Sequence, residues 1–285
     1  MKYLEVGSKK FLLGKKTLIM GILNATPDSF SDGGRHFSAD AAINHAIKLE
    51  EDGADIIDIG GESTRPGAKQ ISSKEEIKRV LPIIERLADK LSIPLSIDTY
   101  KAEVAEKAIE LGVGMVNDVT ALQGDHGLVN VITKHNVPIC LMHMKGNPIT
   151  MQQNPRYDDV VGEICAFLKE RADFAIFYDV KKENIIIDPG IGFGKRTGRG
   201  IEDNCEILKR LPELKRLGYP ILVGTSRKTF IGNVCGGSKQ LPVSERLEGS
   251  LAAACIAAIN GADIIRVHDV KETKRCLDLI NCVIN

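Results

Sequence analysis

The chain has 285 residues, carries 38 Lys+Arg against 38 Asp+Glu, and is 43% hydrophobic and only 5% aromatic, with no Trp. Balanced charge argues against a nucleic-acid or acidic-membrane binder, because such proteins usually carry a basic excess. The low aromatic content argues against a base-stacking surface. The length suits a single domain over 1–285 of the eight-fold barrel kind, which needs about 250 residues. We therefore expect no nucleic-acid partner and no membrane partner.

The N-terminal segment alternates like a pair of strands around Gly7 and Ser8, which predicts a short β-hairpin. It lacks the long apolar core of a signal peptide, and no later run approaches the ~18 apolar residues of a membrane span. The seven cysteines are scattered and form no CxxC pair, which is typical of free thiols in a reducing compartment. The expected location is the cytoplasm.

After this segment, eight short apolar runs each end in polar side chains, and each is followed by a loop and a stretch with helical spacing. The runs span 17–24, 55–63, 94–99, 114–119, 138–144, 185–190, 220–228 and 263–269. Such runs are typical of buried parallel strands joined by right-handed crossovers. An open doubly wound sheet is the alternative, but eight repeats favour an α/β fold of the (β/α)8 TIM-barrel type with the N-terminal hairpin added. In a barrel the polar strand ends gather at one rim, where barrel enzymes hold their active sites.

Helical spacing predicts helices at 39–52, 101–111, 126–135, 158–178, 244–260 and 271–281. Another helix has one apolar face made by Ile77, Val80, Ile84 and Leu87. Ser73 and Glu76 predict a capping box at its start, and Pro82 should kink it or shift its start. Pro212 should likewise kink or shift the start of the helical stretch at 204–218. A glycine at 53, 112, 218 and 261 separates a helix from the next strand, which predicts left-handed caps.

Asp98, Asn117 and Asp188 end the third, fourth and sixth runs. Together they can present hydrogen-bond acceptors in one plane, which suits a flat heterocycle with neighbouring N–H donors. A charged hydrogen bond of this kind contributes roughly 1.5–3 kcal/mol. Each residue alone could be a cap or a turn residue, and Asp98 in particular could cap the helix that follows. Asp58, inside the second run, is likewise too polar to be explained by packing.

A second group of candidates is basic and lies at or just beyond strand ends: Arg65, Arg227, Lys228, Arg266 and His268. Cations gathered in a chain of zero net charge imply an anionic ligand such as phosphate or pyrophosphate. Arg266 and His268 are two residues apart, so they share one side of a strand. The alternative for this pair is an ion pair with Asp263 or Asp269.

The glycine-rich segment 190–195 lacks the spacing and the Ser or Thr of a P-loop. We interpret it as a flexible wall beside Asp188, and the basic run that begins with Lys195 and Arg196 as a solvated loop. His143 could belong to the core or to the second layer of a site. Met142 next to it is usually filler, although Met is also a suitable partner for a flat ring.

Taken in order, these strand ends resemble the dihydropteroate synthase family. The matching strings are MGILNATPDSFSDGG (20–34), GESTRPG (61–67), SIDT (96–99), ND (117–118), MHM (142–144), DPGIGFGK (188–195), SRK (226–228) and RVHD (266–269). The resemblance implies condensation of 4-aminobenzoate with 6-hydroxymethyl-7,8-dihydropterin diphosphate, which gives dihydropteroate and pyrophosphate in folate synthesis. It also implies a homodimer formed through outer helices. Ala25 departs from the family, which more often has Val there, and the segment after Lys195 is longer and more basic than expected.

The resemblance implies a ligand for each candidate residue. The dihydropterin ring would be held by Asp98, Asn117, Asp188 and Lys228, with Met142 beside it. The diphosphate would be held by Arg266, His268 and, through Mg²⁺, Asn24. The aminobenzoate would be framed by Thr64, Arg65, Pro66, Phe193 and Ser226, with Phe30 nearby, and Asp32 would pair with Arg65 when the loops close.

The catalytic residues expected on this basis are Asp98, Lys228, Arg266 and His268. Departure of pyrophosphate leaves positive charge on the pterin, which Asp98 can stabilise. Negative charge on the leaving group can be stabilised by Mg²⁺, Arg266 and His268. The aryl amine is already nucleophilic, so a strong general base is not required.

Other functions stay open at this point. A methyltetrahydrofolate–corrinoid methyltransferase would share the ring-binding Asp and Asn, but it needs neither the Asn24 loop nor the anion-binding Arg266 and His268. A catalytically silent pterin-binding paralogue should have lost Asn24, Arg65 or Lys228. A phosphate-binding aldolase would use Lys228 as a Schiff base.

Overall fold

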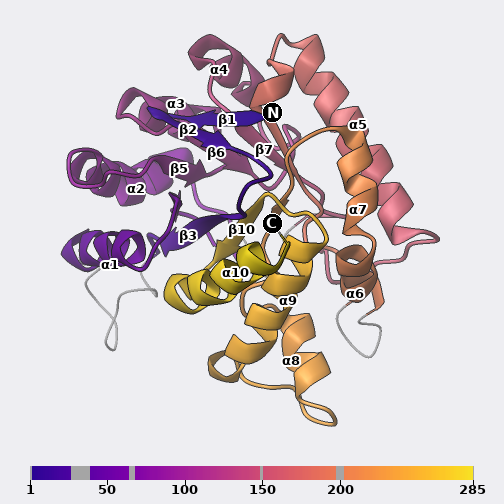
Figure 1. The fold of residues 1–285 in the computed structure, drawn as a ribbon. Helices are drawn as coiled ribbons and strands as arrows, with labels where there is room; N and C mark the ends of the chain where they lie inside the picture. Colours follow the sequence, from indigo (N-terminus) through magenta and orange to yellow (C-terminus); the bar gives the residue numbers. More distant parts are fainter. Residues whose placement is uncertain (1, 27–38, 64–67, 148–149, 197–201, 285) are drawn as a thin grey trace.

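A barrel of parallel strands inside a ring of helices makes up the protein (Figure 1). The computed structural model describes residues 2–26, 39–63, 68–147, 150–196 and 202–284. The strands of the barrel are β3 (Leu18–Asn24), β4 (Ile56–Gly60), β5 (Leu95–Asp98), β6 (Met115–Asp118), β7 (Ile139–Met142), β8 (Ile185–Asp188), β9 (Leu222–Val223) and β10 (Ile264–Val267). Their order is β8-β7-β6-β5-β4-β3-β10-β9. A parallel bridge between Ile187 and Ile221 joins β8 to β9 and closes the barrel, which confirms the predicted fold.

The helices that cover the barrel follow the strands in alternation. They are α1 (Ala39–Glu51), α2 (Ser73–Ala88), α3 (Ala102–Glu110), α4 (Leu128–His135), α5 (Val160–Phe177), α6 (Glu202–Lys209), α7 (Leu211–Leu214), α8 (Thr229–Cys235), α9 (Leu247–Ile259) and α10 (Val270–Ile284). Short 3-10 turns lie at Lys182–Asn184, Lys215–Leu217 and Val243–Glu245. None of the helices in the described ranges is long and apolar enough to cross a bilayer.

Two local predictions for the helices need correction. The cap of α2 is Ser72, whose hydroxyl accepts a hydrogen bond from the backbone N–H of Glu75 at 3.2 Å, so the predicted capping box was one residue too late. Pro82 does not shift the start of α2, which runs from Ser73 through the proline to Ala88. Pro212, in contrast, lies in the first turn of α7 after α6 has ended, where its missing N–H is tolerated.

The glycines that precede four strands all adopt the predicted left-handed conformation. Their φ angles are +100° at Gly53, +98° at Gly112, +85° at Gly218 and +100° at Gly261. Such angles cost little only for glycine. The returns from helix to strand are therefore short, and the longer, specific loops lie at the opposite end of the barrel.

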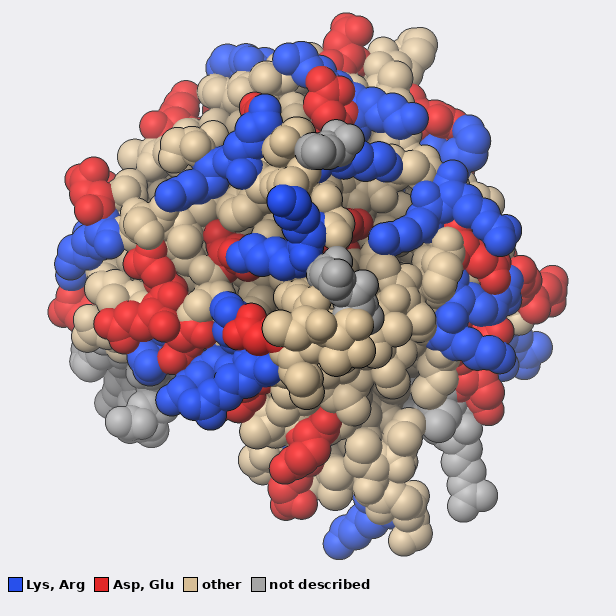
Figure 2. All heavy atoms as spheres, in the orientation of Figure 1, with Lys and Arg blue, Asp and Glu red and all other residues tan. Residues whose placement is uncertain are grey.

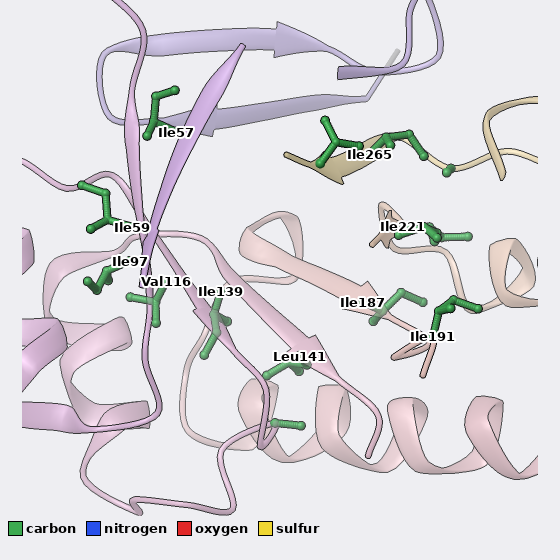
Figure 3. Close-up of a cluster of buried hydrophobic side chains, with 14 of the residues drawn as sticks. Ile57, Ile59, Ile97, Val116, Ile139, Leu141, Ile187, Ile191, Ile221 and Ile265 are labelled. Carbon is green, nitrogen blue, oxygen red and sulfur yellow. The ribbon is translucent and has the colours of Figure 1, made fainter. Parts of the chain in front are cut away.

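The side chains of the strands divide into two sets because their direction alternates with a period of two. The outward set packs under the helices in the main core and includes Ile57, Ile59, Ile97, Val116, Ile139, Leu141, Ile187 and Ile265 (Figure 3). The inward set forms a smaller apolar cluster made of Leu18, Met20, Ile56, Met115, Cys140, Ile186, Leu222 and Ile264. Burying one such aliphatic side chain contributes about 1.5–3 kcal/mol. The strands are thus apolar on both faces at their amino ends.

The predicted N-terminal hairpin is confirmed and closes one end of the barrel. Its strands β1 (Tyr3–Val6) and β2 (Lys9–Leu12) pair antiparallel, and Leu4 and Val6 are fully buried in the inward cluster. A Cβ on Gly114 would lie 2.2 Å from the backbone nitrogen of Gly7, so only glycine lets the hairpin approach the start of β6. The interior is therefore filled at this end, and polar groups occupy the other.

Candidate functional site

The inward positions change from apolar to polar toward the carboxyl ends of the strands. Counting in steps of two from the inward cluster leads to Asn24, Asp58, Asn117, Met142, Asp188 and Arg266. Asp98 lies on the same side, because its neighbour Ile97 on β5 packs in the outward core. In the register of the sheet, Asp98 lies beside Asn117, and Met142 beside Asp188. Asn24 and Asp98 lie on either side of Gly60. The strand ends singled out in the sequence are therefore brought together at one mouth of the barrel.

Arg266 is the centre of a buried network in this mouth. Its Nε donates to Oδ2 of Asp58 at 2.6 Å, and its Nη2 donates to Oδ2 of Asp98 at 2.8 Å. The same oxygen of Asp58 accepts a hydrogen bond from Nδ2 of Asn117 at 3.0 Å. Two strands, β4 and β5, are thus tied directly to one guanidinium, and β6 is tied to it through Asp58.

This network rules out two alternatives left open by the sequence. Arg266 pairs with neither Asp263 nor Asp269: Asp263 accepts from the backbone N–H of Ile221 at 2.9 Å, and Asp269 pairs with Arg227 at 2.5 Å. The carboxylate of Asp98 faces Arg266 and does not cap α3, whose N-cap position has no side-chain cap.

Burial and nearby charges shift the pKa values of the network. Burial raises the pKa of Asp98 to about 7, with Arg266 opposing the rise and Asp58 adding to it. Burial alone would lower the pKa of Arg266, but Asp58 and Asp98 raise it above its usual value, so the guanidinium stays charged. Asp98 can therefore change its charge near neutral pH while its partner cannot.

Lys228 and Asp188 form the second charged group. Burial lowers the pKa of Lys228 to about 8, against the opposing effect of Asp188. Its ammonium lies 4.0 Å from the centroid of the Phe193 ring, a cation–π geometry. Burial raises the pKa of Asp188, while a 2.7 Å hydrogen bond from the backbone N–H of Gly190 lowers it.

The glycine-rich wall, which was interpreted as flexible, makes hydrogen bonds along its length. The carbonyl of Gly192 accepts from Nε2 of Gln152 at 2.5 Å, and that of Gly194 accepts from the Tyr157 hydroxyl at 2.6 Å. Gly190, Gly192 and Gly194 all have positive φ angles. A Cβ on Gly190 would lie 1.9 Å from the carbonyl oxygen of His143. The wall thus rests directly on the backbone after β7.

Lys195 was predicted to lie in a solvated loop, and this was wrong. Its side chain is fully buried, and its Nζ lies 2.8 Å from Nδ1 of His143, 3.1 Å from the His143 carbonyl and 2.7 Å from the Pro189 carbonyl. Burial lowers the pKa of Lys195 well below its usual value, and burial with the nearby Lys195 charge lowers that of His143 to about 2. The amine can be buried because it finds three partners. Arg196, the next residue, pairs with Asp203.

Ser226 and His268 meet at the end of β10, where Oγ of Ser226 lies 3.0 Å from Nδ1 of His268. Arg227, expected among the anion-binding residues, bonds Asp269 through both Nε and Nη2, and its backbone N–H donates to Ser250. Its guanidinium therefore serves the fold more directly than a ligand. Thr64, Arg65 and Pro66 lie outside the described residues, as do Phe30 and Asp32.

Known proteins resemble this chain in sequence over most of its length. A family model described as "Pterin binding enzyme" matches residues 20–268. The dihydropteroate synthase of Synechocystis sp. is 50% identical over 268 residues, covering 94% of this chain and 90% of that protein. That of Escherichia coli (strain K12) is 44% identical over 267 residues, covering 94% and 92%.

Solved structures agree with the sequence matches. The dihydropteroate synthase of Yersinia pestis with a sulfonamide drug complex has a TM-score of 0.90 at 41% identity and covers 99% of this chain and 98% of that one. The enzyme of Xanthomonas albilineans in complex with 7,8-dihydropteroate has a TM-score of 0.87 at 41% identity, with coverages of 99% and 98%. This chain belongs to the dihydropteroate synthase family of pterin binding enzymes.

Proposed function

We propose that this barrel mouth condenses 4-aminobenzoate with 6-hydroxymethyl-7,8-dihydropterin diphosphate, releasing pyrophosphate and giving 7,8-dihydropteroate. The observation that carries the proposal is the inward polar layer, in which Asp98, Asn117 and Asp188 lie close to the half-buried cations Lys228 and Arg266. The family membership and the relatives' names support the same reaction. They do not favour the corrinoid methyltransferase or the silent paralogue.

The ring-binding half of the proposed site contains acceptors and one cation. Asp98, Asn117 and Asp188 offer acceptors to the N–H groups of the dihydropterin, while Lys228 donates toward a ring acceptor from above Phe193. Met142, inward and buried beside Asp188, provides an apolar contact for the ring. Because these groups are buried, each hydrogen bond to the ring is made away from competing water.

The chemistry follows from charges that develop at two ends of the substrate. When the C–O bond to the diphosphate breaks, positive charge on the exocyclic methylene and ring is stabilised by ionised Asp98, and negative charge on the leaving group by Arg266 and His268. Groups already fixed in place stabilise such charges without reorganisation at the moment of reaction. The aryl amine then attacks the methylene carbon, and its proton leaves to solvent.

The diphosphate half fits a Mg²⁺ ion held mainly by substrate. Within the described ranges there is no cluster of three or more His, Cys, Asp or Glu side chains that could hold a metal by itself. The amide of Asn24, half-buried at the end of β3, offers one neutral oxygen. Mg²⁺ commonly takes one or two protein oxygens, substrate phosphates and several waters. When bound, it would neutralise charge on the leaving pyrophosphate.

The aminobenzoate would lie above the pterin, toward solvent. Phe193 on the glycine-rich wall and Ser226 before α8 are the described residues placed to contact it. Thr64, Arg65 and Pro66 complete this subsite in the proposal. The order of the subsites follows from the closed amino end of the barrel, because the ligand held by the inward layer must lie deeper.

We also propose that the protein is a cytoplasmic homodimer. Its seven cysteines are all free, as in a reducing compartment. Helices α9 and α10 expose Ile256, Ile259, Leu279 and Val283, and Figure 2 shows a mostly uncharged area over these helices, whereas acidic and basic residues are interleaved around it. Apolar area of this kind supports a contact with a second copy. A Leu279→Lys variant that sediments as the wild type does would contradict this placement.

The test is release of pyrophosphate from the pterin diphosphate with Mg²⁺, with and without 4-aminobenzoate, followed by mass detection of dihydropteroate. Product that requires both substrates is expected from the wild type, with a loss of roughly 10- to 100-fold in Lys228→Met, because a charged donor in the barrel mouth is removed. The control is Lys134→Met, in the last turn of α4, whose exposed Nζ pairs with Glu106 on α3 at 2.7 Å in the outer ring of helices. Equal loss in both variants, or release without an aryl amine, would contradict the assignment.

A further inference from the structure

Asp58 has no role in the functions assigned above, although it is the most deeply buried carboxylate of the inward layer. It lies in the middle of β4, is 0% exposed, and sits between Ile22 on β3 and Ser96 on β5 in the register. The next inward residue on β4 is Gly60, beside Asn24 and Asp98. Asp58 is therefore one step below the level at which ligands would be held.

One oxygen of Asp58 joins the two halves of the site. Oδ2 accepts from Nε of Arg266 at 2.6 Å and from Nδ2 of Asn117 at 3.0 Å. Arg266 belongs to the diphosphate half and Asn117 to the ring half. Because both donors share a single acceptor, movement of one changes the position or the strength of the other.

Stability alone does not account for this carboxylate. Its Oδ1 has no partner among the described residues, and neither has Oγ of Ser96 directly across the ladder. A buried ion pair is often no more stabilising than a well-packed apolar group, and an unsatisfied oxygen makes it less so. The inward neighbours Met20 and Cys140 show that apolar side chains fit this part of the barrel. The residue thus needs a reason other than packing.

We propose that Asp58 is a positioning residue, which holds Arg266 and Asn117 in a fixed relation so that the ring and the leaving group of the pterin diphosphate are aligned for bond cleavage. This inference rests on the proposed function. Asp58 does not touch substrate in this account. It acts through Arg266 and Asn117, which contact the substrate in this account. The acceptor oxygen that they share fixes the distance between them.

The charge of Asp58 has a second effect, on Asp98. The charges that act on the carboxylate of Asp98 are those of Arg266 on β10, Asp58 on β4, Glu76 on α2, Asp118 on the outer side of β6, and Lys228 beyond β9. Arg266 lowers the pKa of Asp98, and the three acidic groups raise it, with Asp58 the strongest of them. Removal of the Asp58 charge removes the strongest acidic effect on Asp98, while Arg266 continues to lower its pKa, so the pKa of Asp98 falls. Activity that needs ionised Asp98 then persists to lower pH.

The experiment compares Asp58→Asn with Asp118→Asn, a matched control. Asp118 is also 0% exposed, but it points outward from β6 and accepts from the backbone of Thr120 at 2.7 Å and of Leu122 at 2.6 Å. Both variants lose a buried carboxylate of the barrel. Thermal unfolding, kcat, KM for each substrate and the pH profile of kcat/KM are measured for both, together with the wild type.

For Asp58→Asn we expect kcat/KM for the pterin diphosphate to fall by roughly 10- to 100-fold, the usual worth of a hydrogen bond to a charged group. KM for 4-aminobenzoate should change less than about twofold. The acidic limb of the profile should move to lower pH, by more than in Asp118→Asn, because Asp118 acts on Asp98 least of the three acidic groups. Asp118→Asn should lower the unfolding temperature and leave both KM values near those of the wild type.

A second variant covers the case in which Asp58→Asn does not fold. Asn117→Ala leaves Asp58 and Arg266 in place but removes one of the two donors to Oδ2. If Asp58 couples the halves, Asn117→Ala weakens inhibition by pyrophosphate as well as binding of the pterin, although Asn117 lies in the ring half.

Three outcomes overturn the inference while the proposed function stands. They are Asp58→Asn kinetics that match those of Asp118→Asn, an unmoved acidic limb, or unchanged pyrophosphate inhibition in Asn117→Ala with wild-type turnover intact. Absence of dihydropteroate from the wild type would instead overturn the proposed function. Calorimetric titration of a pterin and of pyrophosphate into wild type, Asp58→Asn and Asn117→Ala then still tests the coupling.

Discussion

The pterin half of the site should bind its ligand with a bell-shaped dependence on pH. Ring binding needs Asp98 ionised and Lys228 protonated, and burial moves their pKa values toward each other, to about 7 and about 8. As the pH falls below about 7, Asp98 gains a proton and loses charge as an acceptor. As it rises above about 8, Lys228 loses its proton and becomes a weaker donor. Affinity is therefore greatest between these values.

The size of the effect follows from linkage. Beyond either limb, each pH unit reduces the fraction of protein in the binding state up to tenfold, which corresponds to about 1.4 kcal/mol of binding free energy. In an ordinary solvated site, with Asp near 3.9 and Lys near 10.4, the same range of pH would show no change. The narrow bell is thus a direct consequence of burial in the barrel.

The assay is calorimetric titration of 6-hydroxymethyl-7,8-dihydropterin, whose ring keeps its lactam proton across the range used, from pH 5.5 to 9.5. This ligand lacks the diphosphate, so no phosphate group titrates. Lys228→Met serves to assign the limbs, because it should lose the alkaline limb and keep the acidic one at lower overall affinity. A constant affinity across this range in the wild type, or loss of the acidic limb in Lys228→Met, would refute the reasoning.

Three other predictions concern the wall beside Asp188. Lys195→Met leaves two carbonyls and a ring nitrogen without their donor. Urea denaturation should therefore show a free energy of unfolding lower by about 2–5 kcal/mol. An unchanged value would mean that the amine is not buried. Gly190→Ala should lower the free energy of unfolding by about 3 kcal/mol or more, because its Cβ would lie 1.9 Å from a backbone oxygen. Gly218→Ala, with φ +85° and open space around the Cβ, should lower it by only about 1–2 kcal/mol. Equal decreases would contradict the packing. His143→Gln should make the free energy of unfolding less sensitive to acid. Because the pKa of His143 is lowered to about 2 in the folded protein, the stability of the wild type falls as the pH drops below the unfolded pKa near 6.5. The difference in unfolding free energy between variant and wild type should therefore change by up to about 1.4 kcal/mol per pH unit between pH 6 and 4.

The fold was predictable because its periodicities are strong. Polar residues inside apolar strands are costly, so Asp98, Asn117 and Asp188 could be singled out by position alone. The period of two then placed them with Arg266 on one side of the sheet. A shift by one residue would have sent every one of them into the outer core, so this part of the site is determined by the sequence pattern.

Other features depend on contacts that a single sequence does not display. Asp58 was visible as a polar residue in a strand, but its partners come from strands on other parts of the barrel. Lys195 follows three glycines, and the same letters fit an exposed loop or a buried one. Its burial became clear only from the carbonyls around it. Ser72 was missed as a cap because Ser73 beside it satisfies the same pattern one residue later.

The single bridge between β8 and β9 gives the barrel a seam. On one side of the seam β8 ends in Asp188, and on the other the chain continues from β9 to Lys228. A molecule bound to both residues would link β8 to β9 across this seam of the barrel. Amide hydrogen exchange at Ile187 and in β9 should then slow on pterin binding more than exchange at the continuous β3–β4 ladder. The bound ligand would thus contribute to closing the barrel that binds it.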